Sequence, residues 1–141
     1  MSHHAYQLYA HITWHTWQRV GCLNERTAAD VLVALECAAR RTPVRVLRRA
    51  VLSDHLHVLV SYRPDARVSD FVRLAKSISS YRANKRIPGA LKWARGFYVA
   101  SYHKKDLPMV AAYIARQYIR HPDRVPGATR QPSLTPGESP G

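Results

Sequence analysis

Two histidines separated by one residue are the first candidates for chemistry in this sequence. His55 and His57 lie in the short apolar segment Asp54–Val60, whose β-branched composition predicts a buried strand. Side chains alternate across a strand, so both imidazoles point to one face, about 7 Å apart, where they could share one divalent cation. The alternative is a pair of ordinary polar residues on the wet face of a half-exposed sheet. The spacing alone leaves both interpretations open.

A second pair of candidates lies near the end of the chain. Tyr113 and Gln117 are four residues apart in a segment with helical periodicity, so they project from the same side of a helix. Both lie beside the apolar stripe of that helix, where a phenol and an amide oxygen could border a cation held by the histidines. Most helical tyrosines, however, are edges of a hydrophobic core. The spacing does not distinguish Tyr113 from Tyr118 or Tyr102 as a nucleophile.

Four segments with the composition of β-strands position these residues. Alternation, aromatic content and β-branched residues predict strands over 6–16, 44–52, 55–62 and 92–102. The first strand places His11 on the face opposite Ile12 and Trp14. Because only Ser53-Asp54 joins the second strand to the third, these two strands are expected to form an antiparallel hairpin.

Three segments have helical periodicity. The first helix begins near Asn24 or Thr27, where Thr27 and Asp30 resemble a capping box. Ser69 is expected to cap the second helix and Asp106 the third. The apolar stripes consist of Val31, Leu32, Leu35, Ala38 and Ala39 in the first helix, Phe71, Leu74, Ala75 and Ile78 in the second, and Leu107, Ala111, Ile114 and Tyr118 in the third.

The element order β-α-β-β-α-β predicts an α+β fold. In a ferredoxin-like or RRM-like antiparallel sheet of this order, two helices cover one face, and here the open face would carry the histidines. The third helix, which carries Tyr113, is an additional C-terminal element. We expect one domain over residues 1–121 and a disordered Pro-, Gly- and Ser-rich tail over 122–141. Such a fold alone does not decide the function.

The charge of the chain points to a polyanionic partner. Lys and Arg total 22 against 9 acidic residues, a net charge of +13, so nucleic acid is the first candidate. An anionic membrane is disfavoured because no basic amphipathic helix of the surface-seeking kind is present. Asp54 is the only carboxylate between Glu36 and Asp65, which disfavours a two-metal nuclease built on clustered carboxylates.

Polar side chains on the second and third helices are candidates for contacts with DNA. Four residues of the second helix are spaced to lie on one stripe, which suits either a phosphate backbone or a merely solvated helix face. Two lysines precede the third helix. The candidate DNA-binding residues are Arg73, Lys76, Ser80, Asn84, Lys104 and Lys105.

Cysteine usage and apolar segments bear on the compartment. Cys22 and Cys37 do not make a disulfide framework. No apolar run approaches the length of a membrane span, and the first residues lack the apolar segment of a signal peptide. A cytoplasmic localisation is therefore expected.

The two pairs taken together resemble a known family. Asp54-His55-Leu56-His57 followed by Tyr113-Ile114-Ala115-Arg116-Gln117 is similar to the single-tyrosine HUH transposases, which are insertion-sequence transposases of the IS200-like type and REP-associated tyrosine transposases. The similarity covers about residues 6–117 in element order and spacing. The chain departs from the family at His103-Lys104-Lys105, where hinge glycines are common. Other positions that resemble the family pattern are Phe71, Lys76, Ser79, Ser80 and Trp93.

The resemblance implies a metal-dependent transposase that cleaves and rejoins single-stranded DNA bearing a hairpin. His55, His57 and Gln117 would bind a divalent metal (Mg or Mn), and Tyr113 would attack a DNA phosphate to give a 5′-phosphotyrosine and a free 3′-hydroxyl. This chemistry is physically sound, since a cation neutralises charge growing on the phosphate and the phosphotyrosine conserves the bond for rejoining. The resemblance also implies a homodimer, in which Tyr113 would act beside its own histidines or those of a partner.

Other functions remain open at this point. A non-catalytic RRM-like module would bind single-stranded nucleic acid by stacking bases on aromatic side chains and would need neither metal nor Tyr113. A domesticated relative would act on repeated hairpins without moving itself. A replication-initiator nuclease of the same superfamily usually has a different order of motifs.

Overall fold

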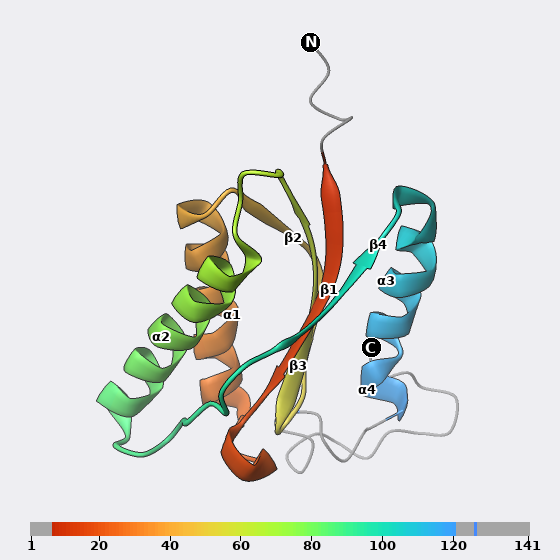
Figure 1. Cartoon of the computed structure of the whole chain (residues 1–141). Helices are drawn as coiled ribbons and strands as arrows, with labels where there is room; N and C mark the ends of the chain where they lie inside the picture. Colours follow the sequence, from red (N-terminus) through yellow and green to blue (C-terminus); the bar gives the residue numbers. More distant parts are fainter. Residues whose placement is uncertain (1–6, 121–125, 127–141) are drawn as a thin grey trace.

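A four-stranded antiparallel sheet with helices on both faces forms the centre of the molecule (Figure 1). The structure is a computed structural model that describes residues 7–120 and residue 126. The strand order is β2-β3-β1-β4. The strands are β1 Leu8–His15, β2 Val44–Val51, β3 His55–Tyr62 and β4 Tyr98–Tyr102. The predicted α+β fold is confirmed, whereas Tyr6 and the predicted tail over 122–141 lie outside the described residues, apart from residue 126.

Two long helices cover one face of the sheet and the C-terminal helices cover the other (Figure 1). The helices are α1 Glu25–Arg41, α2 Val68–Arg86, α3 Leu107–Ala115 and α4 Gln117–Arg120, with short 3-10 turns η2 Trp17–Arg19 and η3 Lys104–Asp106. No helix within residues 7–120 is long and apolar enough to cross a bilayer.

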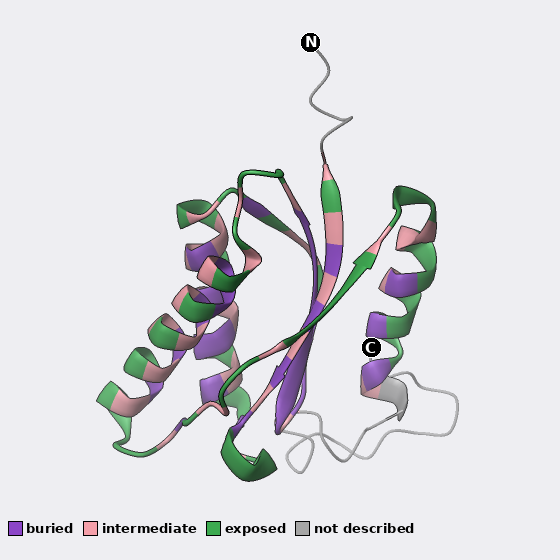
Figure 2. Ribbon diagram, viewed as in Figure 1, coloured by how far each residue is buried: buried purple, intermediate pink, exposed green. Residues whose placement is uncertain are grey.

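The main hydrophobic core lies between the sheet and the helices α1 and α2. Alternate residues of β1 and β3 point into it, among them Ile12, Trp14 and Val58, which are almost completely buried. Val31 and Leu35 of α1 and the ring of Phe71 in α2 pack against this face. In Figure 2 the buried residues of both helices form stripes toward the sheet, as amphipathic helices require.

A second, smaller core lies on the opposite face. Its fully buried members are Ala50 of β2, Leu59 of β3, and Val110 and Ile114 of α3. Val110 and Ile114 are four residues apart on α3 and so form the stripe that packs on the strands. Leu107, Ala111 and Tyr118 pack partly buried around them, which confirms the predicted stripe of this helix.

The predicted start of α1 near Asn24 is confirmed, but its capping box has other members than predicted. Asn24 is the N-cap, and its side chain accepts hydrogen bonds from the backbone N–H groups of Arg26 and Thr27. Thr27 returns the bond by accepting from the Asn24 N–H, so the capping box is Asn24 with Thr27. The predicted box of Thr27 with Asp30 is wrong, because Asp30 is buried between α1 and α2 and binds Arg86 through two hydrogen bonds.

Two boundaries were misplaced. Helix α2 begins at Val68 with Arg67 at the N-cap, so Ser69 lies inside the helix and does not cap it. Strand β4 begins at Tyr98 and not at residue 92. The segment before Tyr98 pairs with the sheet only at the bridge of Thr16 with Trp93 and then turns at Gly96, whose φ of 81° is left-handed.

Candidate active site

His55 and His57 lie on the face of β3 that α3 covers. Their ring centroids are 5.0 Å apart, with ring planes at 78°. Both residues are buried, with 8% and 7% of their surface exposed, although each carries a polar ring. The predicted placement of the two rings on one face is confirmed, and their burial is unlike that of polar residues on a wet sheet face.

Asp54 fixes the orientation of His55. Its Oδ1 lies 2.7 Å from His55 Nδ1, so the ring N–H donates to the carboxylate. The backbone carbonyl of Asp54 accepts from both the N–H and the hydroxyl of Thr16, at 2.9 and 3.2 Å. A carboxylate that holds Nδ1 of an imidazole leaves Nε2 to coordinate a metal and increases its basicity.

His11 and Thr13 of β1 hold His57 in the same way. His57 Nδ1 lies 2.9 Å from His11 Nε2 and 3.3 Å from the Thr13 hydroxyl. Thr13 is the cross-strand partner of His57, which places its side chain on the same face. Burial lowers the pKa of His11, so its neutral ring is favoured and can accept a hydrogen bond from the His57 Nδ1–H.

Tyr113 is the tyrosine that the fold brings to the histidines. The centroid of its ring lies 5.9 Å from that of His57 and 5.8 Å from that of His11, both edge-on. Its side chain remains 37% exposed. Tyr118 points instead into the smaller core, where its hydroxyl accepts from the Val51 N–H at 2.8 Å. Only Tyr113 of these two can therefore meet a ligand at the histidines.

Gln117 is buried beneath the tyrosine. It is 3% exposed, and its Nε2 donates to the backbone carbonyl of Tyr113 at 3.2 Å. The helix is not continuous here, because α3 ends at Ala115 and α4 begins at Gln117. This hydrogen bond uses the amide nitrogen of Gln117 and not its amide oxygen, the atom that would bind a metal. The role of Gln117 as a metal ligand stays a prediction.

The donor set at this site fits a divalent cation. Two buried imidazoles are held through Nδ1, which selects Nε2 as the ligand atom of each ring. Within the described part of the chain no three His, Cys, Asp or Glu side chains come together as a metal-binding group. Oxygen donors of another type that could complete the set are the amide oxygen of Gln117, the DNA phosphate or water.

A further histidine stands beside the pair. His15 is the cross-strand partner of His55, so both side chains lie on the same face. Burial and the positive charges of Arg19 and Lys76 lower the pKa of His15. The sequence placed His11 on this face without indicating a role for it, and His15 was missed. The signal was available in the alternation of β1, which places 11, 13 and 15 on one face.

The predicted DNA-binding stripe of α2 is largely occupied within the protein. Lys76 Nζ donates to the carbonyls of Ala94 and Gly96 at 2.9 and 2.7 Å. Asn84 exchanges two hydrogen bonds with the backbone of Leu91. Both side chains thereby fix the connection between α2 and β4.

The remaining predicted DNA contacts have different surroundings. Arg73 is exposed and pairs with Asp70, and the Ser80 hydroxyl donates to the Lys76 carbonyl. Lys104 and Lys105 are exposed in η3. The DNA-binding role of all six residues stays a prediction.

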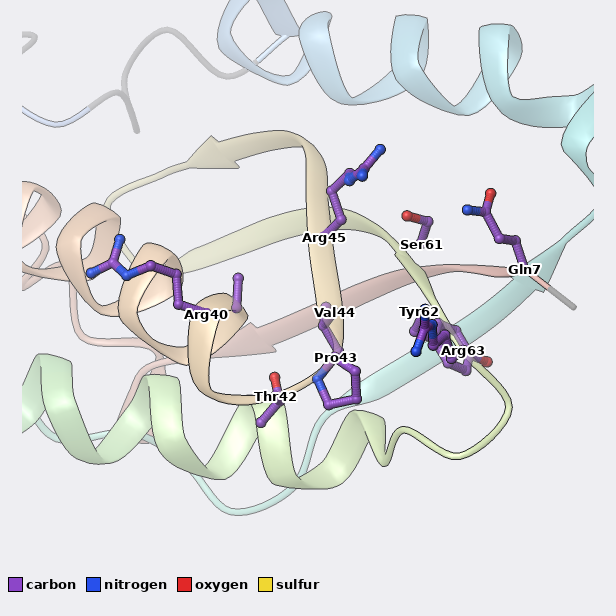
Figure 3. Close-up of a pocket in the computed structure, with 10 residues that line it drawn as sticks. Gln7, Arg40, Thr42, Pro43, Val44, Arg45, Ser61, Tyr62 and Arg63 are labelled. Carbon is purple, nitrogen blue, oxygen red and sulfur yellow. The ribbon is translucent and has the colours of Figure 1, made fainter. Parts of the chain in front are cut away.

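A cluster of arginines that the sequence reasoning missed surrounds the free edge of β2. A hollow of about 420 Å³ lies at the end of the sheet away from His55 and is lined by Arg40, Arg45 and Arg63 (Figure 3). Arg45 pairs with Ser61 in the sheet, and the two side chains point to the same side in Figure 3. The arginine cluster consists of Arg40, Arg41, Arg45, Arg48, Arg49 and Arg63, all exposed.

None of these six guanidinium groups pairs with a carboxylate among residues 7–120. The cluster is therefore a concentrated positive surface, which suits a nucleic-acid backbone. Six arginines within 24 positions were visible in the sequence. Their gathering at one edge depends on the end of α1 meeting the start of β2.

The chain is similar in sequence to known transposases. A family model described as "Transposase IS200 like" matches residues 4–117. The ISDra2 transposase TnpA of Deinococcus radiodurans is 24% identical over 122 residues, which cover 82% of this chain and 87% of that protein.

Two solved structures share the fold. A proposed transposase from Deinococcus radiodurans R1 superposes with a TM-score of 0.62 at 24% identity, over 79% of this chain and 92% of that chain. A REP-associated tyrosine transposase bound to a REP hairpin superposes with a TM-score of 0.69 at 18% identity, over 81% of this chain and 68% of that chain. At these identities the two structures establish the fold alone.

Proposed function

Because the chain belongs to the family of IS200-like transposases, we propose that it cleaves and rejoins single-stranded DNA through a covalent 5′-phosphotyrosine at Tyr113. The observation that carries the proposal is the approach of the Tyr113 ring to within 6 Å of the His57 and His11 rings in one chain. A helix that only covers the sheet needs apolar side chains toward it. The partly exposed phenol of Tyr113 beside two buried and oriented imidazoles is not explained by packing alone.

The proposed reaction is a phosphoryl transfer in two directions. The Tyr113 oxygen attacks the scissile phosphorus, the P–O3′ bond breaks, and the 3′-oxygen takes up a proton to leave as a hydroxyl. In rejoining, a 3′-hydroxyl attacks the phosphotyrosine and releases Tyr113, so no ATP is needed. A protonated phenol is a weak nucleophile, and a nearby positive charge favours its deprotonation.

His55, His57 and Gln117 are the residues that would hold a divalent cation. When bound, the cation would polarise the phosphate and offset the charge of the transition state. Mg²⁺ prefers oxygen ligands, so two imidazoles favour Mn²⁺ or another transition metal in vitro. Asp54 and His11 would keep the two ligand rings in place through their Nδ1 atoms.

Removing the side chain of His11 should weaken metal binding without removing a ligand. Loss of a residue that orients a ligating histidine commonly lowers metal affinity about 10- to 100-fold. We therefore expect His11→Ala to raise the Kd for Mn²⁺ by that factor in titration calorimetry. His103→Ala, which removes an exposed histidine beyond β4, is the matched control and should leave the Kd unchanged. Equal affinities of wild type and His11→Ala would contradict the orienting role.

Hairpin-bearing single-stranded DNA is the proposed partner. The charge of +13 supports a polyanion, and one structural relative was solved bound to a REP hairpin. In the proposed arrangement the arginine cluster at the β2 edge contacts the phosphates of the duplex stem, while the single strand reaches Tyr113 on the face of the sheet.

Neutralising the arginine cluster should weaken hairpin binding in a salt-dependent manner. Each phosphate contact adds about 0.9 to the slope of log K against log salt for duplex DNA. The triple variant Arg40→Ala, Arg45→Ala, Arg63→Ala should therefore lower the slope by about 2–3, measured by fluorescence anisotropy at several salt concentrations. Arg26→Ala, at the exposed start of α1, serves as a control with a slope change below 1. An unchanged slope in the triple variant would remove the cluster from the binding surface.

We also propose that the protein is a homodimer. Two copies could join their sheets or exchange their last helices, and the latter would bring Tyr113 of one subunit to the histidines of the other. We expect light scattering at micromolar concentration to give twice the chain mass of 16.0 kDa. A monomeric mass under these conditions would refute the dimer and leave Tyr113 acting beside its own histidines.

The decisive experiment for the function is a search for the covalent adduct. The protein would be incubated with Mn²⁺ and a library of hairpin-bearing single-stranded oligonucleotides, and adducts resistant to detergent and heat would be collected and sequenced. Recovery of a defined hairpin and cleavage position supports the proposal. Tight binding without an adduct in any library would favour a non-catalytic binding module, and preference for plain duplex would count against both.

A further inference from the structure

A groove runs between α3 and the part of the sheet that α3 leaves uncovered. Its floor includes His11 of β1 and Tyr102 of β4, and its wall consists of Met109, Val110, Tyr113 and Arg116. The groove holds about 370 Å³, which lies in the range of about 300–1,000 Å³ typical of small-molecule pockets. It opens directly beside the proposed nucleophile.

Tyr102 lines the groove from β4, and Tyr98 and Ala100 lie on the same face of that strand beside it. Tyr98, Ala100 and Tyr102 alternate along the strand and pair with Thr13, His11 and Tyr9 of β1, so they share the face of the histidines. Ala100, the cross-strand partner of His11, has only a methyl side chain, so the surface between Tyr98 and Tyr102 is lower than at either ring. Tyr98, on the edge strand β4, is 68% exposed, so a large aromatic ring is open to solvent beside the groove.

The wall of the groove is a second stripe of α3. Met109, Tyr113 and Arg116 follow one another at helical spacing, while the buried stripe of Val110 and Ile114 packs on the strands. Met109 is 61% exposed, and Arg116 is exposed without a carboxylate partner among residues 7–120. The groove thus combines apolar and aromatic walls with one cation at the end nearest α4.

We infer that this groove is a nucleobase subsite, which takes the base of a nucleotide flanking the phosphate that Tyr113 attacks. The inference rests on the proposed function and adds to it the path of the single strand. The base would stack in the groove between Tyr102 and Met109, while Arg116 holds a backbone phosphate. Tyr98 would stack the next base outward along β4.

Charge and position favour single-stranded DNA over other occupants. A base has a flat apolar face for the aromatic residues, and its phosphate matches Arg116 on a protein with a charge of +13. The groove is continuous with Tyr113, so a nucleotide in it would be joined to the reacting phosphate. A duplex could not place one base between the strands and α3 without unpairing, which explains a preference for single strands.

The test combines a protein variant whose groove is filled by a larger side chain with a DNA substrate that lacks one base, and asks whether the two losses are independent. The substrate is the hairpin oligonucleotide recovered by adduct formation, with an abasic residue placed in turn at each position next to the cleavage site. Met109→Trp fills the groove from an exposed position, and Ile87→Trp at the exposed end of α2 adds the same ring elsewhere. Adduct formation (kcat/KM) is measured for each protein on each substrate, after circular dichroism melting has shown that each variant is folded.

At one position the abasic residue should lower kcat/KM of the wild type and of Ile87→Trp about 5- to 100-fold, the value of one stacked base. Met109→Trp should show that loss on the intact substrate and no further loss on the abasic one. The subsite would be overturned if the losses in kcat/KM from Met109→Trp and from the abasic residue multiply. It would also be overturned if no position is sensitive to the abasic residue.

A second measurement does not depend on cleavage. Oligonucleotides carrying 5-iododeoxyuridine near the hairpin would be crosslinked by ultraviolet light to Tyr113→Phe protein, and the modified peptide identified by mass spectrometry. Crosslinks to Tyr98 or Tyr102 support the subsite even if no adduct ever forms, which would refute only the proposed reaction. Crosslinks confined to other tyrosines, such as the exposed Tyr81 of α2, would overturn it.

Discussion

Tyr113→Phe should abolish the covalent protein–DNA adduct while the fold and the affinity for hairpin DNA survive. The substitution removes one oxygen from a side chain that is 37% exposed and makes no hydrogen bond through that oxygen within residues 7–120. Within residues 7–120, Asp54 is the carboxylate beside the histidines, and no second one joins it there to activate water instead. Adduct formation on a denaturing gel should therefore fall to the level of the reaction without protein.

Two other tyrosines provide matched controls for this result. Tyr118→Phe removes the acceptor of the Val51 N–H, so it should lower stability by about 1–3 kcal/mol and still form the adduct. Tyr81→Phe on the exposed face of α2 should change neither property. A band that persists in Tyr113→Phe would show that another residue is the nucleophile.

Replacing both histidines should eliminate metal binding. In His55→Ala, His57→Ala the two buried nitrogen ligands disappear together, so the affinity for Mn²⁺ should fall more than 100-fold, beyond the loss expected for an orienting residue. Titration calorimetry gives the measurement, and adduct formation should disappear in parallel.

The control for this double variant is DNA binding. Hairpin affinity in the presence of a chelator should be close to that of the wild type, because Arg40, Arg45 and Arg63 of the arginine cluster line the hollow at the other end of the sheet. An unchanged Mn²⁺ affinity in the double variant would place the metal elsewhere or remove it from the mechanism.

The fold was predictable because its signals are local and repetitive. Period-two alternation in β1 and β3 and the apolar stripes of three helices predicted which faces meet, and the short Ser53-Asp54 link predicted the hairpin. The errors fell at boundaries. The capping box of α1 and the start of β4 depend on competing partners, since Arg86 binds Asp30 and Lys76 binds the carbonyl of Gly96.

The candidate site was predictable only in part. The pair His55 and His57 followed from strand geometry alone, and the choice of Tyr113 needed the family resemblance. His11 was assigned to the correct face, but its hydrogen bond to His57 arises from the register of β1 against β3, which the sequence does not specify. Likewise, the sequence does not reveal that the connection before β4 folds back over Lys76 and accepts a hydrogen bond from it.

The two hydrophobic cores have very unequal sizes, and this has a consequence for motion. Among the described residues, seventeen buried side chains join α1 and α2 to the sheet, whereas four join α3 to it. Because local opening free energies follow buried apolar contacts, we expect α3 to open at a lower free energy than α1 and α2. The proposed nucleophile Tyr113 thus lies on the helix with the smaller core, and His55 and His57 lie on the well-packed sheet. Opening of α3 would move Tyr113 and the neighbouring Gln117 away from His55 and His57. The scissile phosphate of the proposed reaction could then enter, and the covalently held strand leave, while both histidines stay in place on the sheet.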